Sequence, residues 1–472
     1  MNVLYVSAEV APFSASGGLG DVSGALPKAL TSRGACVSVI SPLYGTVKNE
    51  YQTQMTKITE LRFNLSWRNV GANVYGIKIN GVNYYFIENN NYFNRGRLYG
   101  EFDDGERFAF FSMAVLEFIR SHSISVDILH ANDWHSALTV IYLKTIYNQD
   151  KKLGRIQTVF TIHNIEYQGV FDPNILSDVF GLSEFHRNIT EYDGAINLMK
   201  GALVSADMTT TVSEGYAEEL KYEFYSHGLS PIINSLKIGP VGIPNGMDTE
   251  EYSPMNGRDI YYSYDRSNVD AGKLKNKEYL YDQLNIKADT SVPLAVMVTR
   301  LASAKGIDLV LHILEELLCQ QITIIILGSG NAEYERKLSE LSSAHENLVV
   351  KIGFDRKLSK KLYAASDMFI MPSRSEPCGL AQMIACSYGS LPIVRSVGGL
   401  KDTIIPYGEI GANGFRFDNY NAHELLYTIK AAIDVFKNKK ELKKLRQNAM
   451  SSDFTWDRSA EKYIKLYENL IK

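Results

Sequence analysis

Residues Ser14 to Asp21 form a glycine-rich stretch, SASGGLGD, between an apolar run and a helical pattern. Glycines in this place let a backbone approach a phosphate closely, and free amide groups at a helix start attract an anion. The same turn can equally be only a tight strand-to-helix connection. A dinucleotide site would also need an acidic residue at the end of the next strand. That strand ends in VISPLYG, so the pattern disfavours NAD.

Two cations, Arg300 and Lys305, follow another apolar run and are separated by the sequence LASA. A strand end followed by a helix would place both over one small volume. Two unit charges about 4 Å apart interact by on the order of 4 kcal/mol at an effective dielectric near 20, so a diphosphate leaving group would be well stabilised there. The alternative is a pair of surface cations that contact only water.

Glu376 comes directly before a Pro-Cys-Gly-Leu turn that opens another helix. A carboxylate followed by free amide groups, here those of Cys378, Gly379 and Leu380, suits a ligand with hydroxyls at one end and a phosphate at the other. Glu376 could instead be an acid that complements a helix dipole, and Cys378 could be a small packing group.

His163 ends the apolar run TVFTIHN and is the histidine most suggestive of chemistry, although a strand-end histidine can also be structural. His130, Asp133 and His135 in HANDWH could be read as metal ligands. They lack the HExxH spacing and no fourth ligand is in view, so we expect no metal. Aromatic residues nearby could form a wall that stacks on sugar rings or could simply be core; they are Trp134, Tyr92, Phe93 and Tyr99.

These candidates follow short β-branched runs that alternate with amphipathic helical stretches, the pattern of parallel sheets covered by helices on both faces. The fold class is therefore α/β, with two doubly wound units. Expected strands are 2–8, 35–41, 126–133, 158–164 and 206–213 in the first half, and 293–300, 322–328, 347–353, 368–373 and 391–396 in the second. Ligands of such sheets bind outside the carboxyl ends of the strands, where Glu9 and Asn245 also fall.

The chain of 472 residues, 45% of them hydrophobic, is long enough for two domains. We place the boundary near residue 245, in a stretch rich in Gly, Pro, Asn and Asp, giving domains 1–245 and 246–455. Residues 456–472 form an amphipathic helix that must pack on another element. Its apolar face consists of Ala460, Tyr463, Ile464, Tyr467, Leu470 and Ile471.

The net charge of −4, with both signs interspersed, gives no basic stripe for a nucleic-acid backbone. The four cysteines lack paired metal-ligand spacing and do not suggest a disulfide framework. The N-terminus shows no targeting signal, and the longest apolar runs are too short to cross a bilayer. We therefore expect a cytoplasmic protein with neither nucleic acid nor a membrane as partner.

Together these segments resemble the glycogen and starch synthases of the bacterial and plant type, which transfer glucose from ADP-glucose to an α-1,4-glucan. The matching segments run in family order along nearly the whole chain and include SGGLGDVSGALPKAL, DDGERFAFFS, HANDWHSAL, FTIHNIEYQG, TTTVSEGYAEEL, PNGMD, TRLASAKGIDL, SRSEPCGLAQMIACSYG and FTWDRSAEKY. The resemblance implies a GT-B fold, two Rossmann-like domains facing across a deep cleft, with the last helix crossing back to the first domain. It also implies no metal and no cofactor beyond the nucleotide sugar.

The resemblance further implies residue roles. Arg300 and Lys305 would neutralise the diphosphate, Glu376 would bind sugar hydroxyls, and His163 would lie beside the reacting carbon. Gly18 would give an amide to the phosphates, Gly379 and Leu380 would cap the donor, and Phe354 would face the adenine. The full set of implied substrate contacts is Glu9, Gly18, Asp21, Asp133, Asn164, Asn245, Phe354, Cys378, Gly379 and Leu380.

Ala15 and Ser16 stand where the family usually has Lys-Thr or Lys-Val, so a cation beside the phosphates is missing. Ala381 and Asn94 are further departures, which bear on donor and acceptor detail. We still expect the activity of a retaining glucosyltransferase to survive, because both Arg300 and Lys305 are present, and the resemblance implies a preference for ADP-glucose. Two alternatives stay open: a glucan-binding or regulatory homologue with little turnover, and a phosphorylase-like enzyme, although no pyridoxal phosphate signature is evident.

Overall fold

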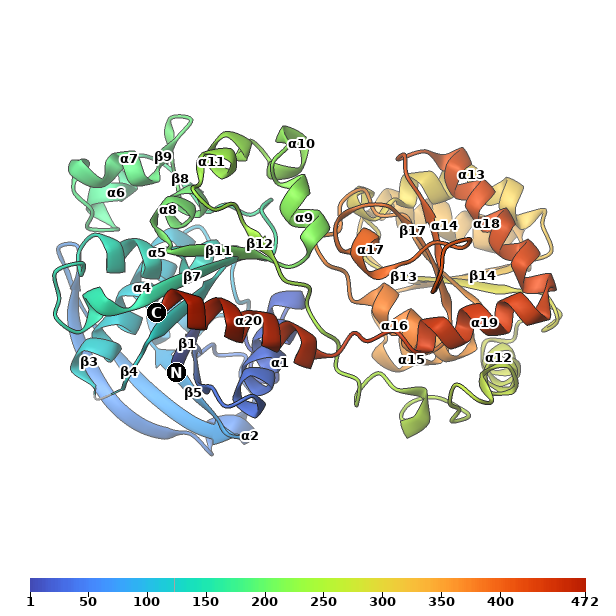
Figure 1. Ribbon diagram of the computed structural model, residues 1–472, viewed down its shortest axis with the longest axis horizontal. Coiled ribbons are helices and arrows are strands. Elements are labelled where there is room, and N and C mark those ends of the chain that lie inside the picture. The colour runs from blue at the N-terminus through green and yellow to red at the C-terminus, as the bar shows by residue number, and fades with distance from the viewer. Residues whose placement is uncertain (123) are drawn as a thin grey trace. The chain divides into compact units, whose positions relative to one another are not determined.

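The computed structural model describes residues 1–122 and 124–472 and consists of two compact units (Figure 1). Unit 1 contains Met1–Gly246 and Trp456–Lys472, and unit 2 contains Met247–Thr455. The chain passes between them twice, first inside the glycine- and proline-rich stretch at 238–254. The backbone amide of Met247 donates to the carbonyl of Phe454 at 2.7 Å, so the two connecting segments lie side by side where they enter unit 2.

Unit 1 is built on a nine-stranded sheet of order β12-β11-β7-β6-β1-β2-β5-β4-β3. Seven strands are parallel, and they are β1 (Asn2–Val6), β2 (Cys36–Pro42), β5 (Val82–Glu88), β6 (Ile128–Asn132), β7 (Gln157–Ile162), β11 (Met208–Thr211) and β12 (Val241–Gly242). The antiparallel hairpin of β3 (Thr56–Leu65) and β4 (Arg68–Ile79) extends the sheet beyond β5. A small antiparallel sheet has the order β8 (Val170–Phe171), β10 (Ala195–Asn197) and β9 (Glu191–Tyr192).

Helices cover the unit 1 sheet, and two of them, α4 and α5, are buried along almost their whole length because they lie in the core. The helices are α1 (Gly18–Ser32), α2 (Asn49–Gln52), α3 (Asn90–Phe93), α4 (Asp104–Ser121), α5 (Trp134–Lys144), α6 (Ile175–Asp178), α7 (Arg187–Thr190), α8 (Leu198–Ser205), α9 (Glu214–Glu219), α10 (Glu223–Ser226), α11 (Ser230–Ser235) and α20 (Trp456–Leu470). Short 3₁₀ turns occur at Leu153–Arg155 and Glu184–His186.

The C-terminal helix α20 belongs to unit 1, where it packs on α1 (Figure 1). Its Ala460, Tyr463 and Tyr467 are buried, and the Tyr467 hydroxyl lies 2.6 Å from Nδ1 of His130. Burying these aromatic side chains supplies the packing partner that the amphipathic pattern of this segment requires.

Unit 2 is a six-stranded, fully parallel sheet of order β15-β14-β13-β16-β17-β18. Its strands are β13 (Leu294–Val298), β14 (Thr323–Gly328), β15 (Leu348–Ile352), β16 (Met368–Met371), β17 (Leu391–Arg395) and β18 (Phe415–Phe417). Its helices are α12 (Val269–Leu284), α13 (Ile307–Leu318), α14 (Ala332–Ala344), α15 (Arg356–Ala365), α16 (Ala381–Ser387), α17 (Gly398–Thr403), α18 (Ala422–Lys437) and α19 (Lys439–Met450), with 3₁₀ turns at Pro254–Asn256 and Ser303–Lys305.

The strand pattern missed the stretch 56–88 of unit 1, which forms β3, β4 and β5, and also the short strands β8, β9, β10 and β12. The hairpin residues alternate between exposed and buried positions, as expected of an antiparallel sheet with one solvated face, so they lack the continuous apolar runs used to find parallel strands. No helix in the described residues is both long and apolar enough to cross a membrane.

Candidate active site

The glycine-rich turn of unit 1 is held in place by Glu9, whose side chain is fully buried after β1. Its carboxylate accepts hydrogen bonds from the backbone amide of Ser16 at 2.6 Å and the Ser16 hydroxyl at 2.8 Å. The backbone amide of Gly17 donates to Oε2 of Glu9 at 3.3 Å, and the Tyr99 hydroxyl donates to Oε1 of Glu9 at 2.5 Å. Glu9 therefore fixes the backbone that leads into α1.

The glycines of this turn serve different purposes. A Cβ on Gly20 would lie 2.4 Å from the Ala15 Cβ, so Gly20 is required for packing. A Cβ on Gly18 would meet nothing within 4 Å, and Gly18 is exposed in the first turn of α1. The space beside Gly18 is thus open for a ligand at the positive end of the helix dipole. Asp21 is also exposed in this first turn.

Asp133 lies between β6 and α5 with a φ of +54°, a conformation that is unusual for a residue with a side chain. Its Oδ1 accepts the backbone amides of His163 at 2.8 Å and Asn164 at 3.4 Å, so it bridges the ends of β6 and β7. Burial raises the pKa of Asp133 to about 7, although these two amides oppose the shift.

His163 is half-buried at the end of β7, and its Nε2 lies 2.9 Å from Oδ1 of Asn132. That oxygen also accepts the Tyr5 hydroxyl, while the Asn132 amide group donates to the Val6 carbonyl. His163 must therefore donate from Nε2, which leaves Nδ1 with its lone pair. Burial lowers the pKa of His163 to about 3, so the ring is neutral at physiological pH.

The other histidines of the HANDWH segment are not arranged for metal binding. Both ring nitrogens of His130 face hydroxyls, those of Tyr467 and Thr161, and His135 stacks on Trp134 with ring centroids 4.1 Å apart. Within the described residues, no group of three or more His, Cys, Asp or Glu side chains could hold a metal ion. These histidines belong to the core of unit 1.

Two further residues of unit 1 were predicted to contact substrate, Asn164 and Asn245. Asn164 is half-buried beside Asp133, and its side chain accepts the amide of Glu166 at 3.0 Å. Asn245 is half-buried and lies next to Gly246, the last residue of the first segment of unit 1. The structure adds the hydrogen bonds that join Ser16 and Tyr99 to Glu9, and the bond from Tyr99 spans 90 positions, so no local pattern could predict it.

In unit 2, Lys305 and Glu376 form an ion pair with Nζ 2.6 Å from Oε2. Both side chains are largely buried, and the Ser373 hydroxyl donates to the same carboxylate oxygen at 3.0 Å. The structure thus brings together two residues that are 71 positions apart. The family resemblance implies that they contact different parts of a ligand, Lys305 the phosphates and Glu376 the sugar.

Close backbone contacts create this pair. Gly306, with a φ of +74°, approaches the Pro372 carbonyl so closely that a Cβ would lie 2.2 Å from it. Buried Arg395 holds the neighbouring loop by donating to the Ser373 carbonyl at 2.9 Å and the Arg374 carbonyl at 2.5 Å. Arg395 was not singled out from the sequence, because its partners are backbone atoms 21 and 22 positions away.

Arg300 follows β13 and is exposed. Within the described residues, no carboxylate lies within ion-pair distance of its guanidinium. The backbone after it is fixed by the Gly328–Gly330 turn, since Leu301 exchanges backbone hydrogen bonds with Ser329 and Asn331. Arg300 is therefore a cation on a rigid support whose charge is available to a ligand.

The remaining predicted residues of unit 2 also follow carboxyl ends of strands. Phe354 is 84% exposed after β15, which leaves a large aromatic face without protein contacts over most of its area. Gly379 has a φ of +76°, and Leu380 precedes α16. Cys378 is buried, and its carbonyl accepts a hydrogen bond from the Gln382 side chain at 3.0 Å.

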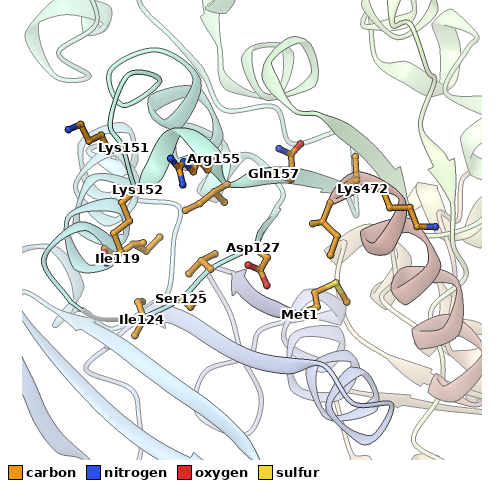
Figure 2. A pocket seen from close by; sticks show the side chains of 14 residues that line it. Met1, Ile119, Ile124, Ser125, Asp127, Lys151, Lys152, Arg155, Gln157 and Lys472 are labelled. Carbon is orange, nitrogen blue, oxygen red and sulfur yellow. Dashed lines mark hydrogen bonds between the residues drawn. The ribbon is translucent and has the colours of Figure 1, made fainter.

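A cavity of unit 1 lies elsewhere, at the opposite ends of the parallel strands (Figure 2). Its volume is about 960 Å³, and its lining includes Met1, Asp127 and Gln157 at the amino ends of β1, β6 and β7. Lys151 and Lys472 line it, but their ammonium groups point outward in Figure 2. Ligands of open α/β sheets bind at the carboxyl ends, so this cavity is not the candidate active site.

Two doubly wound α/β units with this arrangement at the carboxyl ends of their strands define a glycosyltransferase of the GT-B class. The family model "Starch synthase catalytic domain" matches residues 2–235, and "Glycosyl transferases group 1" matches residues 283–452. The chain belongs to the glycogen synthase family. It is 42% identical to the glycogen synthases of Clostridium novyi (strain NT) and Clostridioides difficile (strain 630), covering all of this chain and 99% and 100% of theirs.

Solved structures agree with this assignment. The catalytic domain of starch synthase IV from Arabidopsis thaliana, bound to ADP and acarbose, is 31% identical with a TM-score of 0.90, and the match covers 99% of both chains. Sucrose-phosphate synthase from Thermosynechococcus elongatus matches at 18% identity with a TM-score of 0.61, covering 99% of this chain and 98% of that one, and shows the shared fold.

Proposed function

We propose that the protein transfers glucose from ADP-glucose, with retention of configuration, to the 4-hydroxyl at the non-reducing end of an α-1,4-glucan. The observation that carries the proposal is the ion pair of Lys305 and Glu376 after the carboxyl ends of unit 2 strands, with exposed Arg300 shortly before Lys305 in the chain. A relative with the same fold binds ADP and acarbose, which supports a nucleotide donor and a glucan acceptor.

In the proposed reaction, unit 2 binds the donor. Arg300 and Lys305 stabilise the diphosphate as its charge develops, and Glu376 accepts hydrogen bonds from glucose hydroxyls. Lys305 then exchanges part of its contact with Glu376 for the phosphates. Phe354 offers its exposed ring to the adenine, and the backbone of Cys378, Gly379 and Leu380 caps the donor.

Unit 1 contributes groups that position the reactants. The amide of Gly18 binds the phosphates, while Glu9 and Asp21 hold or flank the turn that presents it. Neutral His163 lies beside the reacting carbon, and Asp133, Asn164 and Asn245 contact the glucosyl group and acceptor. The bond between glucose C1 and the phosphate oxygen breaks, the bond to the acceptor O4 forms on the same face, and the acceptor proton passes to the departing diphosphate. No metal or organic cofactor takes part in this scheme.

One observation favours a second function. Ala15 stands where the family places a lysine, so the protein could bind glucan with little turnover. The two are separated by measuring incorporation of labelled glucose into glycogen from ADP-glucose and from UDP-glucose. We expect faster transfer from ADP-glucose. Equal rates from both donors would contradict the donor assignment, and glycogen binding without transfer from either would favour the second function.

A further inference from the structure

The turn between β3 and β4 carries an exposed tryptophan, Trp67. Its exposed fraction is 73%, whereas that of Trp134 is 9% and Trp456 is half-buried. A large aromatic ring in this environment loses the stabilisation that burial would provide. Its exposure therefore calls for a structural reason or a ligand.

The ring is held rigidly in spite of its exposure. Nε1 of Trp67 donates to Oδ1 of Asp178 at 2.8 Å, at the end of α6. The guanidinium of Arg68 covers one face, with its carbon 4.4 Å from the ring centroid. The Arg68 guanidinium is itself held in place. It donates to the backbone carbonyl of Asp178 at 2.5 Å and to the Asp178 carboxylate at 3.3 Å, and its Nε lies 3.5 Å from the Glu106 carboxylate.

The indole keeps an exposed fraction of 73% although its orientation is already set. Because the ring is ordered before a ligand arrives, binding to it costs little further conformational entropy. The Asp178 side chain is 56% exposed, and hydrogen bonds from Trp67 and Arg68 hold the pKa of its carboxyl below the usual range. Asp178 is therefore an ionised acceptor at the edge of the ring.

We infer that Trp67, Arg68 and Asp178 form a second glucan-binding site, outside the candidate active site. The C–H face of a glucose ring stacks on the exposed ring of Trp67, and its hydroxyls donate to Asp178 or accept from Arg68. The inference rests on the proposed function, since that function supplies a polymeric substrate long enough to bind at two places. The β3–β4 hairpin lies at one end of the sheet, with β2, β5 and β4 between β1 and β3.

The surroundings of the ring favour a neutral polyhydroxylated ligand over other partners. A stable protein interface needs about 800 Å² on each partner, far more than one indole ring flanked by ionised side chains provides. Exposed Arg62 and the hydrogen-bonded pair of Asn64 and Asn69 lie on the same hairpin and add to its polarity. The carboxylate of Asp178 would repel an anionic ligand at the edge of the ring.

Trp67→Ala tests the site in the whole enzyme, with Trp67→Phe as the conservative variant and Tyr427→Ala, which removes an exposed ring from unit 2, as the control. We expect Trp67→Ala to raise KM for glycogen by about fivefold to tenfold, with kcat and the KM for ADP-glucose unchanged. Turnover of maltotriose, too short to span two sites, stays at the wild-type level. Trp67→Phe recovers most of the glycogen affinity, and Tyr427→Ala has no effect.

Tryptophan fluorescence provides a readout that does not depend on transfer. Titration with maltoheptaose should shift the wild-type emission to shorter wavelength, and Trp67→Phe should lose this shift. A wild-type KM for glycogen in Trp67→Ala, with normal maltotriose turnover, would overturn the proposed site. A change in the oligomeric state of Trp67→Ala on size-exclusion chromatography would also overturn it, because Trp67 would then belong to a protein interface. If no glucan is elongated by the wild type, the proposed function fails, while the fluorescence titration still decides whether Trp67 binds glucan.

Discussion

The carboxyl ends of the strands in the two units carry different chemistry. In unit 1, the buried carboxylates of Glu9 and Asp133 are compensated by amide and hydroxyl donors, and His163 is neutral. In unit 2, buried Glu376 is compensated by the ammonium of Lys305, and Arg300 is a further cation. One unit therefore offers fixed dipoles and the other offers formal positive charge.

This difference indicates a division of work in the reaction. Removing one preorganised group that stabilises developing charge commonly costs a factor of about 10² to 10³ in kcat, so the cations of unit 2 should dominate the rate. The hydrogen-bonded groups of unit 1 should mainly set the shape of the site and its pH dependence. Four measurements test this comparison.

The largest effect is expected from Arg300→Ala. It should lower kcat by about 10² to 10³ and leave the thermal midpoint unchanged, because the side chain is exposed and has no ion-pair partner in the described residues. Lys305→Ala should lose comparable activity and also roughly 1–3 kcal/mol of stability, since it leaves buried Glu376 without its charge partner. Turnover within about threefold of wild type for either variant would refute the assignment of charge stabilisation to unit 2.

The glycine turn provides a matched pair in unit 1. Gly18→Ala places a methyl in open space and should raise KM for ADP-glucose by about tenfold with no loss of stability. Gly20→Ala places a methyl against Ala15 and should destabilise the fold by about 1–3 kcal/mol. Urea unfolding and donor kinetics separate the two. If Gly18→Ala binds the donor normally, the turn is only a connection.

Asp133 should give unit 1 a distinctive pH dependence of stability. Its pKa rises from 3.8 to about 7 on folding, so the folded state holds an extra proton between these values and stability falls as the pH rises through them. Asp133→Asn removes this loss. The free energy of unfolding of the variant, relative to that of the wild type, should rise by about 2 kcal/mol from pH 5 to pH 8. Chemical denaturation at the two pH values measures the gain. A constant difference between the proteins would show that Asp133 is ionised throughout.

The smallest effect is expected at Ala15, where a lysine would give unit 1 a formal positive charge like those of unit 2. Ala15→Lys adds a cation beside the turn and should raise kcat/KM for ADP-glucose by about threefold, an amount typical of an exposed charge near a helix start. Ala15→Met, of similar length without charge, is the control. An equal change in both variants would assign the effect to packing.

Much of the fold follows from local pattern. The β-branched runs predicted the parallel strands β1, β2, β6, β7 and β11 and the five strands β13–β17, because a parallel sheet buried on both faces requires continuous apolar segments. The hairpin β3–β4 did not follow, since its alternating residues face water on one side. The amphipathic pattern of 456–472 predicted a packed helix, and the structure identifies α1 as its neighbour.

The sequence by itself determined which residue types stand at strand ends, and thereby the α/β class, Arg300, Lys305, Glu376 and the glycine turn. Only the tertiary structure decided their partners and ionisation states. Tyr99 donates a hydrogen bond to Glu9 across 90 positions. Lys305 forms its ion pair with Glu376 where the backbone of Gly306 closely approaches the Pro372 carbonyl. The neutral state of His163 and the raised pKa of Asp133 depend on burial, which no local spacing encodes.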